Sequence, residues 1–169
     1  MLRNPIALFA IAIGGLFLLL NTIVIVPETQ QAIVVRFGEP IGTKNSYVKG
    51  QEFGETGAGL LARIPFMDQI VWIDKRIQDV EMEQQQVLST DQLRLQVDAF
   101  ARYRITKPIR MFVSTAGNEE RVAAELRPIL GSALRNELGK RPFAALLTPE
   151  RGQIMDAIRA GLNRVARQY

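Results

Sequence analysis

The feature that most constrains the fold is an uncharged apolar run near the start of the chain. Residues 5–26 read PIALFAIAIGGLFLLLNTIVIV, in which Asn21 and Thr22 are the only strongly polar side chains. At 1.5 Å per residue, a helix of this length would extend about 33 Å, enough to cross a hydrocarbon core about 30 Å thick. We therefore predict a retained transmembrane helix over residues 5–26, behind a short tail at residues 1–4.

The main alternative to an anchor is a cleaved signal peptide. Such a peptide has an apolar region of about 7 to 15 residues followed by small residues at the cleavage site, and residues 21–24 offer no such site. Arg3 precedes the run, whereas Glu28 follows it and no basic residue occurs before Arg36. By the positive-inside rule this distribution predicts a cytoplasmic N-terminus, with the bulk of the chain translocated.

The composition excludes several classes of enzyme. The chain of 169 residues contains neither Cys nor His, which rules out Cys nucleophiles, Ser-His triads and nearly all zinc or haem sites. Its 47% hydrophobic and 22% charged residues are near ordinary globular usage, so a buried core is expected. The 21 Lys and Arg form no basic block, which argues against a nucleic-acid surface. We expect no catalytic residues, no cofactor and no metal ion.

Beyond the apolar run the pattern favours strands. Residues 32–37 (AIVVRF) are short and β-branched and are followed by Gly38-Glu39-Pro40, which predicts a strand and a turn. Residues 42–59 contain five glycines among polar residues and are predicted to form an exposed loop. Residues 60–64 and 69–73 are apolar stretches separated by Pro65, which predicts a hairpin whose corner is fixed by an inward-packed Phe66.

The clearest strand pattern covers residues 93–105. Apolar side chains occupy alternate positions from Leu93 to Ile105, with charged or amide side chains between them, so one buried and one solvated face are expected. Phe100 interrupts the polar side. It predicts a contact surface, with an ordinary exposed aromatic as the alternative.

Helices follow this strand. Residues 119–138 carry an apolar stripe at a spacing of four, and Pro128 within it predicts a kink or a restart of the helix. Thr148-Pro149-Glu150 is typical of a helix opening, with Thr148 as the N-cap. A second stripe then runs to Tyr169 without a stop signal, so we expect either a continuing helix in a longer protein or a partner that covers this end. The stripes consist of Val122, Leu126, Leu130, Leu134 and Leu138, and of Ile154, Ile158, Leu162, Val165 and Tyr169.

Four motifs in order behind a single anchor resemble the stomatin/prohibitin/flotillin/HflK-HflC superfamily, also called SPFH or band 7. The motifs are E-x-x-x-A-V-V-x-R-F-G, G-L-x-x-x-x-P-F, I-D-x-R and T-x-D-x-x-x-x-x-V-D. The residues of this chain that carry them are Glu28, Ala32, Val34, Val35, Arg36, Phe37 and Gly38; Gly59, Leu60, Pro65 and Phe66; Ile73, Asp74 and Arg76; and Thr90, Asp91, Val97 and Asp98. The valine pair stands one position later here than in the first motif, and Thr90 stands directly before Asp91. The short tail, the insert at residues 42–57 and the later RNELGKRPFAALLTPERGQI are most similar to HflC-like members.

The resemblance implies an α+β fold, with an antiparallel-rich sheet followed by amphipathic helices. It implies a mainly β first SPFH subdomain at residues 27–90 and a second subdomain at residues 91–169, which consists of one strand plus helices and is expected to be truncated. For function, it implies a non-enzymatic scaffold of the bacterial inner membrane, with its bulk in the periplasm. HflC-like members form a hetero-oligomeric ring or cage with the paralogue HflK and regulate the AAA+ protease FtsH.

Two other functions are considered beside the scaffold. A stomatin-like organiser of membrane microdomains would share the same fold, since a fold does not fix function. A membrane-anchored Ser-Lys hydrolase is a different class, but no serine stands in a nucleophile-elbow context such as G-x-S-x-G.

Two surfaces are candidates for function. A hairpin about thirty residues beyond a bilayer exit lies near the membrane, so its turn is predicted to touch the outer leaflet, although the same residues would serve equally in a core. This turn comprises Gly59, Leu60, Leu61, Pro65 and Phe66. For a subunit interface we single out Phe100, Arg121, Glu125, Arg159 and Arg164, with solvated helix faces as the alternative.

Overall fold

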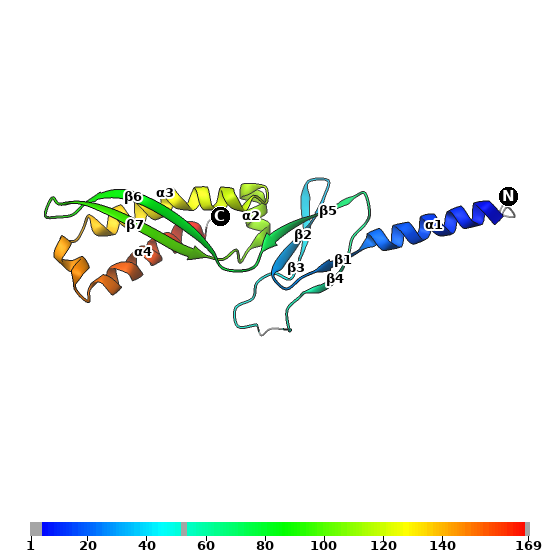
Figure 1. Cartoon of the computed structure of the whole chain (residues 1–169), viewed down its shortest axis with the longest axis horizontal. Helices are drawn as coiled ribbons and strands as arrows, with labels where there is room; N and C mark the ends of the chain where they lie inside the picture. Colours follow the sequence, from blue (N-terminus) through cyan, green and yellow to red (C-terminus); the bar gives the residue numbers. More distant parts are fainter. Residues whose placement is uncertain (1–4, 52–53, 168–169) are drawn as a thin grey trace. The chain divides into compact units, whose positions relative to one another are not determined.

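The computed structural model describes residues 5–51 and 54–167, so the predicted tail at residues 1–4 and the side chain of Tyr169 lie outside the described residues. The described chain contains both helices and strands, as the α+β prediction requires (Figure 1). In chain order the elements are α1 (Pro5–Thr22), β1 (Ile23–Val26), β2 (Gln30–Arg36), β3 (Glu39–Lys44), β4 (Gly59–Ala62), β5 (Asp68–Asp74), β6 (Gln78–Leu88), β7 (Arg94–Tyr103), α2 (Pro108–Thr115), α3 (Glu119–Leu138), the 3-10 helix η1 (Phe143–Leu147) and α4 (Arg151–Ala166).

The chain divides into two compact units. The first unit comprises Met1–Arg76 and Ile105–Phe112, and the second unit comprises Ile77–Arg104 and Val113–Tyr169. The sequence-based division after residue 90 falls between β6 and β7, which pair as one antiparallel hairpin. Pairing keeps the two strands in one body, so the units divide after Arg76 instead.

The first unit holds two small sheets. β2 is the central strand of a three-stranded sheet in the order β3-β2-β5, and β1 pairs with β4 in a second sheet. The predicted strand at residues 32–37 is thus confirmed as β2, whose Ala32 and Ile33 are fully buried. The turn after it consists of Phe37 and Gly38, which both adopt positive φ, as tight hairpin turns require.

The apolar run at residues 5–26 does not form one helix. α1 ends at Thr22, and Ile23–Val26 instead form β1, with Val24 opposite Leu61 and Ile25 opposite Leu60. Alternating isoleucine and valine favour a strand because β-branched side chains lose rotamer freedom in a helix. Among the described residues, none of the helices combines the length and apolarity needed for a membrane crossing.

The predicted loop at residues 42–59 is only partly a loop. β3 extends to Lys44, and Asn45 is 3% exposed rather than solvated. The Asn45 amide donates to the carbonyl oxygens of Pro27 at 3.0 Å, Glu28 at 3.2 Å and Gln30 at 2.8 Å, and its oxygen accepts from Lys75 Nζ at 2.7 Å. One polar side chain therefore fastens the start of this segment to the chain that enters β2.

The second unit is a two-stranded sheet with helices on one face. The predicted strand at residues 93–105 is confirmed as β7, and it pairs with β6 over its whole length. Side chains of α3 and α4 form the core with those of β6 and β7. The buried members of this core are Val80, Val87, Leu126, Leu130, Leu134, Leu138, Ala145, Ile154 and Ile158.

α3 passes through Pro128 as one element, so the predicted restart is wrong. Asn118 is the N-cap of this helix, and its side chain accepts a hydrogen bond from Arg121 N at 3.1 Å. A proline cannot donate to the carbonyl four residues earlier. Ala124 and Pro128 both lie on the exposed face, where water can satisfy that carbonyl. The leucine stripe on the opposite face is buried as predicted.

The predicted N-cap at Thr148 is also wrong. α4 begins at Arg151 after Glu150, and the Thr148 hydroxyl donates backwards to Ala145 O at 3.0 Å, so it terminates η1. The second stripe is confirmed at Ile154 and Ile158, which are 1% and 5% exposed.

Candidate functional site

A carboxylate organises the turn between β4 and β5. Asp68 Oδ1 accepts from Arg36 Nε at 2.7 Å, while its Oδ2 accepts from Arg36 Nη2 at 3.1 Å and from Ile64 N at 2.8 Å. The hydrogen bonds from Arg36 are the main cause that lowers the pKa of Asp68 below its ordinary value, and the Ile64 N–H adds to the effect. Asp68 is only 6% exposed, so the closed turn rests on a shielded ion pair.

Two aromatic rings protrude at this end of the first unit. Phe66 is 90% exposed and Phe37 is 81% exposed, and both residues have positive φ. Because Arg36 pairs directly with Asp68, the β2–β3 turn and the β4–β5 turn lie at the same end of the sheet. The prediction that Phe66 packs inward is wrong, since its side chain is almost fully exposed.

The other predicted residues of the membrane-proximal turn lie before this end. Gly59, Leu60 and Leu61 belong to β4, and Pro65 is half-buried within the turn. Leu60 is 69% exposed beside its partner Ile25, which is 71% exposed. The tip itself is formed by exposed apolar side chains, namely Phe37, Ile64, Phe66 and Met67.

The end of α1 is joined to the same region. Arg63 follows β4, and its backbone N–H donates to Thr22 O at 2.8 Å while its Nε donates to Asn21 O at 3.2 Å. The last carbonyls of a helix lack partners within the helix, and a cation there also complements the helix dipole. Arg63 therefore holds the end of α1 against β4.

The predicted interface residues fall on different faces of the second unit. Phe100 is 71% exposed on the outer face of β7, whereas α3 and α4 cover the inner face. Arg121 and Glu125 are exposed on α3, and Arg159 lies 4.0 Å from Asp156 on α4. Arg164 lines a groove between α3 and α4. The structure therefore does not bring these five residues into a single surface.

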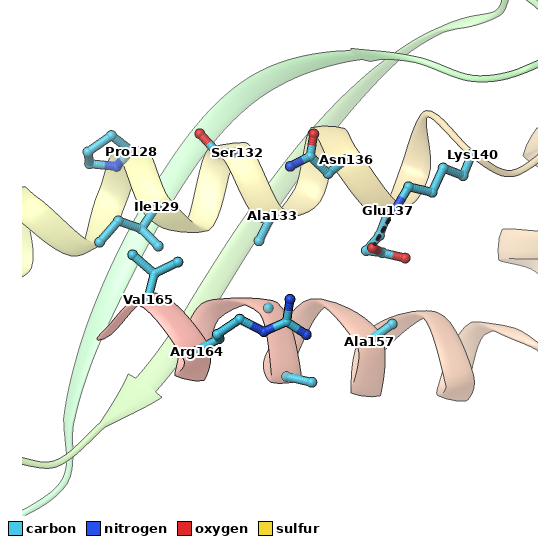
Figure 2. A pocket seen from close by; sticks show the side chains of 12 residues that line it. Pro128, Ile129, Ser132, Ala133, Asn136, Glu137, Lys140, Ala157, Arg164 and Val165 are labelled. Carbon is cyan, nitrogen blue, oxygen red and sulfur yellow. Dashed lines mark hydrogen bonds and ion pairs between the residues drawn. The ribbon is translucent and has the colours of Figure 1, made fainter. Parts of the chain in front are cut away.

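The groove between α3 and α4 has a volume of about 720 Å³. Figure 2 shows Ala133 and Ala157 on facing helices, with Ile129 close to Val165 at one end. At the other end Lys140 Nζ donates to Glu137 Oε1 at 2.9 Å. Small side chains open this groove, and a polar rim borders it.

Two structural carboxylates were not assigned a role from the sequence. Asp68 follows the P-F motif, and only the register that places it opposite Arg36 reveals the pair. Asp91 belongs to the T-x-D motif, and its oxygens accept from Phe143 N at 3.1 and 3.2 Å. This contact ties the β6–β7 turn to the start of η1. In the described ranges, no three metal-binding side chains cluster.

The fold defines a class of protein in which an apolar N-terminal helix leads into two units that carry exposed apolar and charged surfaces. Residues 24–169 match the SPFH domain / Band 7 family, so the chain belongs to this family. This confirms the resemblance seen in the sequence motifs.

Within the family, the chain is HflC-like. It is 25% identical over 158 residues to "Modulator of FtsH protease HflC" of Escherichia coli (strain K12). The aligned residues cover 93% of this chain and 46% of that relative. It is 26% identical over 151 residues to "Protein HflC" of Vibrio parahaemolyticus, covering 89% and 43% of the two chains. A third relative, "Protein HflC" of Buchnera aphidicola, is 26% identical over 163 residues, covering 95% and 50%. The chain thus spans about half the length of these relatives.

Proposed function

We propose that this chain is a membrane-anchored scaffold that regulates an FtsH-type AAA+ protease in a hetero-oligomeric ring or cage with an HflK-like paralogue. The observation that carries the proposal is the similarity, within the SPFH family, to a protein named as a modulator of FtsH protease. The regulation would act through contact and position, without a chemical step in this chain.

Co-purification tests the scaffold. The tagged full-length chain is extracted from bacterial inner membranes in mild detergent, and its partners are identified by mass spectrometry. An HflK-like paralogue and an FtsH-type protease should both be recovered, and native electrophoresis should show a large assembly. Recovery of lipid alone, with the chain monomeric, would reject the scaffold and favour a membrane organiser.

We propose α1 as the membrane-inserted segment, with a cytoplasmic N-terminus and the rest of the chain in the periplasm. The side chains of α1 from Ile11 to Leu20 are all exposed, and the larger of them are aliphatic or aromatic, so a bilayer would remove a continuous apolar surface from water. An alkaline phosphatase fusion after Arg167 should be active, whereas a fusion before Pro5 should be inactive.

The apolar tip of the first unit would then rest in the outer leaflet. Phe37, Ile64, Phe66 and Met67 are exposed near β4, to which Arg63 joins the end of α1. Aromatic rings partition well to a bilayer interface. This arrangement extends the predicted membrane contact of Gly59, Leu60, Leu61, Pro65 and Phe66 to the neighbouring turn.

Fluorescence quenching by brominated lipid tests the tip. Trp72 is the only tryptophan, so a Trp72→Phe background permits a single reporter. In nanodiscs that contain brominated lipid, the emission of Phe66→Trp should be quenched strongly, and that of the matched control Phe100→Trp should not be. Equal quenching at the two positions would show that the tip stays in water.

A further inference from the structure

The guanidinium of Arg63 is fixed at the end of α1 but is only partly used there. Its Nε donates to Asn21 O at 3.2 Å, and the backbone N–H of the same residue donates to Thr22 O at 2.8 Å. Among the residues that the structure describes, its two terminal nitrogens, Nη1 and Nη2, have no hydrogen-bond acceptor and no ion pair. The side chain is half-buried, so the fork of the guanidinium is anchored by one nitrogen and presents the other two.

The charge of Arg63 is not neutralised by a carboxylate of its own. The pKa of Asp68 is lowered mainly by the hydrogen bonds from Arg36, and the charge of Arg63 is the last of its causes. Both oxygens of Asp68 already accept from Arg36, and one also accepts from Ile64 N. Glu39 belongs to β3, on the far side of β2 from Asp68. This end of the first unit therefore presents a cation beside a closed ion pair.

Both elements that meet at Arg63 carry apolar surface. α1 exposes all its side chains over residues 11–20, just before the carbonyls that Arg63 contacts. After Arg63, the turn exposes Ile64 by 46%, Phe66 by 90% and Met67 by 40%. With α1 inserted, the guanidinium lies where the helix leaves the hydrocarbon, at the depth of the lipid headgroups. Phosphate groups are the abundant anions at that depth.

The geometry points to a binding site for the phosphate group of a phospholipid, with Arg63 as the residue that holds it. A guanidinium can place two parallel N–H donors on two phosphate oxygens, and an anchored Nε leaves less rotational freedom to lose on binding. Because Arg63 itself satisfies the carbonyls of Asn21 and Thr22, the phosphate finds N–H donors where the negative end of the helix would otherwise repel it.

The site favours an anionic phospholipid. Phosphatidylglycerol fits better than phosphatidylcholine, whose ammonium group places a positive charge next to its phosphate and would repel Arg63. This inference rests on the proposed insertion of α1, and it names the lipid group that is recognised where the helix leaves the bilayer.

Lipid titration followed by native mass spectrometry tests the site. The full-length chain is held in micelles of dodecyl maltoside, which contains no phosphate, and phosphatidylglycerol is added. One lipid should bind saturably. A galactolipid with the same acyl chains, which carries hydroxyl groups in place of the phosphate, should bind about tenfold more weakly. Inorganic phosphate in millimolar excess should not displace the lipid, because the acyl chains hold the headgroup at the end of α1.

Substitutions at Arg63 separate recognition of phosphate from support of the helix end. Arg63→Gln should weaken binding of phosphatidylglycerol roughly tenfold, because the amide lacks both the charge and the fork. Arg63→Lys keeps the charge alone and should weaken it about threefold. Neither should change binding of the galactolipid, which a merely structural role of Arg63 would lower to the same extent. The matched control Arg127→Gln, exposed on α3, should change neither affinity.

Equal binding of the two lipids, or an equal loss of both in Arg63→Gln, would overturn the site. Displacement of the lipid by inorganic phosphate would also overturn it, since a soluble anion would then be the ligand. The phosphatase fusions test insertion of α1 separately. An active fusion after Arg167 without a preference for the phospholipid would reject the lipid site alone, whereas this preference with an inactive fusion would support the site and reject the proposed topology.

Discussion

The Asp68 carboxylate shows how one residue can hold a protruding turn in place. It receives hydrogen bonds from the Arg36 side chain and from Ile64 N, so the turn is fastened to both β2 and its own start. Charge-assisted bonds of this kind are stronger than neutral ones, and losing them leaves Arg36 without its partner.

We expect Asp68→Asn to loosen the turn. An amide keeps an acceptor oxygen but loses the charge that attracts the guanidinium, so the turn should open more often. Limited chymotrypsin digestion should cleave after Phe66 roughly tenfold faster than in the unaltered chain. Asp156→Asn is the control, because Asp156 is exposed and its ion pair with Arg159 is 4.0 Å long. Unchanged cleavage in Asp68→Asn would show that the ion pair does not close the turn.

The same residue predicts a dependence on pH. The folded-state pKa of Asp68 lies below its ordinary value, so its stabilising effect is complete above that value and disappears as the pH falls through the folded pKa. Hydrogen exchange at Asp68 N and Met67 N, corrected for intrinsic rates, should show protection that is constant above about pH 5 and falls progressively as the pH drops below about 4. In Asp68→Asn this acid transition should be absent, and its persistence would assign the transition to another carboxylate.

At the scale of elements, the contact between α3 and the β6 bulge depends on a missing side chain. A Cβ at Gly131 would lie 3.1 Å from Met82 Sδ and 3.2 Å from Gln85 Oε1, whereas a Cβ at Gly152 of α4 would meet nothing within 4 Å. Gly131 thus permits α3 to approach the strand closely.

This difference gives a paired prediction. Gly131→Val should destabilise the fold by about 1–3 kcal/mol, because the new side chain must displace those of Met82 and Gln85 from their packed positions, despite the slightly better helix propensity of valine. Gly152→Val should leave the free energy of unfolding within about 0.5 kcal/mol of the unaltered chain. Urea denaturation followed by circular dichroism measures both, and an equal effect at the two sites would contradict the close approach.

The elements that the sequence predicts well are those with a strong period. The alternation in β7 and the leucine stripe of α3 each match a single secondary structure. The sequence predicts one helix over residues that form both α1 and β1, because a wholly apolar run has no period to mark where the helix stops. Pairing with β4 makes Ile23–Val26 a strand, and that contact spans some forty residues of chain.

The candidate surfaces were harder to predict for a related reason. Phe66 is exposed at a positive φ, and the role of Asp68 depends on register, neither of which residue type reveals. The alternation around Phe100 already fixes its face, and the residue is exposed there, but its role as a contact surface stays a prediction.

At the scale of the whole molecule, the chain passes between its two units three times. It enters the second unit after Arg76, goes back to the first after Arg104, and enters the second again after Phe112. The core of the second unit contains no residue of the first. This organisation favours separate unfolding of the units.

Leu130→Ala tests that independence. Leu130 is 3% exposed in the second core, so its truncation should cost that unit about 2–5 kcal/mol. In hydrogen exchange, protection should fall at Val80 and Leu134 while Ile33 and Ile73 keep theirs. A matching loss of protection at Ile33 would show that the units unfold as one body.

The direct passage from Thr22 to Ile23, reinforced by Arg63, has a mechanical consequence. Because α1 continues directly into β1, the helix and the strand cannot reorient independently of each other. If α1 lies in a bilayer, as we propose, any tilt of the helix would be transmitted as torque to the β1–β4 ribbon, and the folded part of the chain would respond to the thickness and curvature of the lipid.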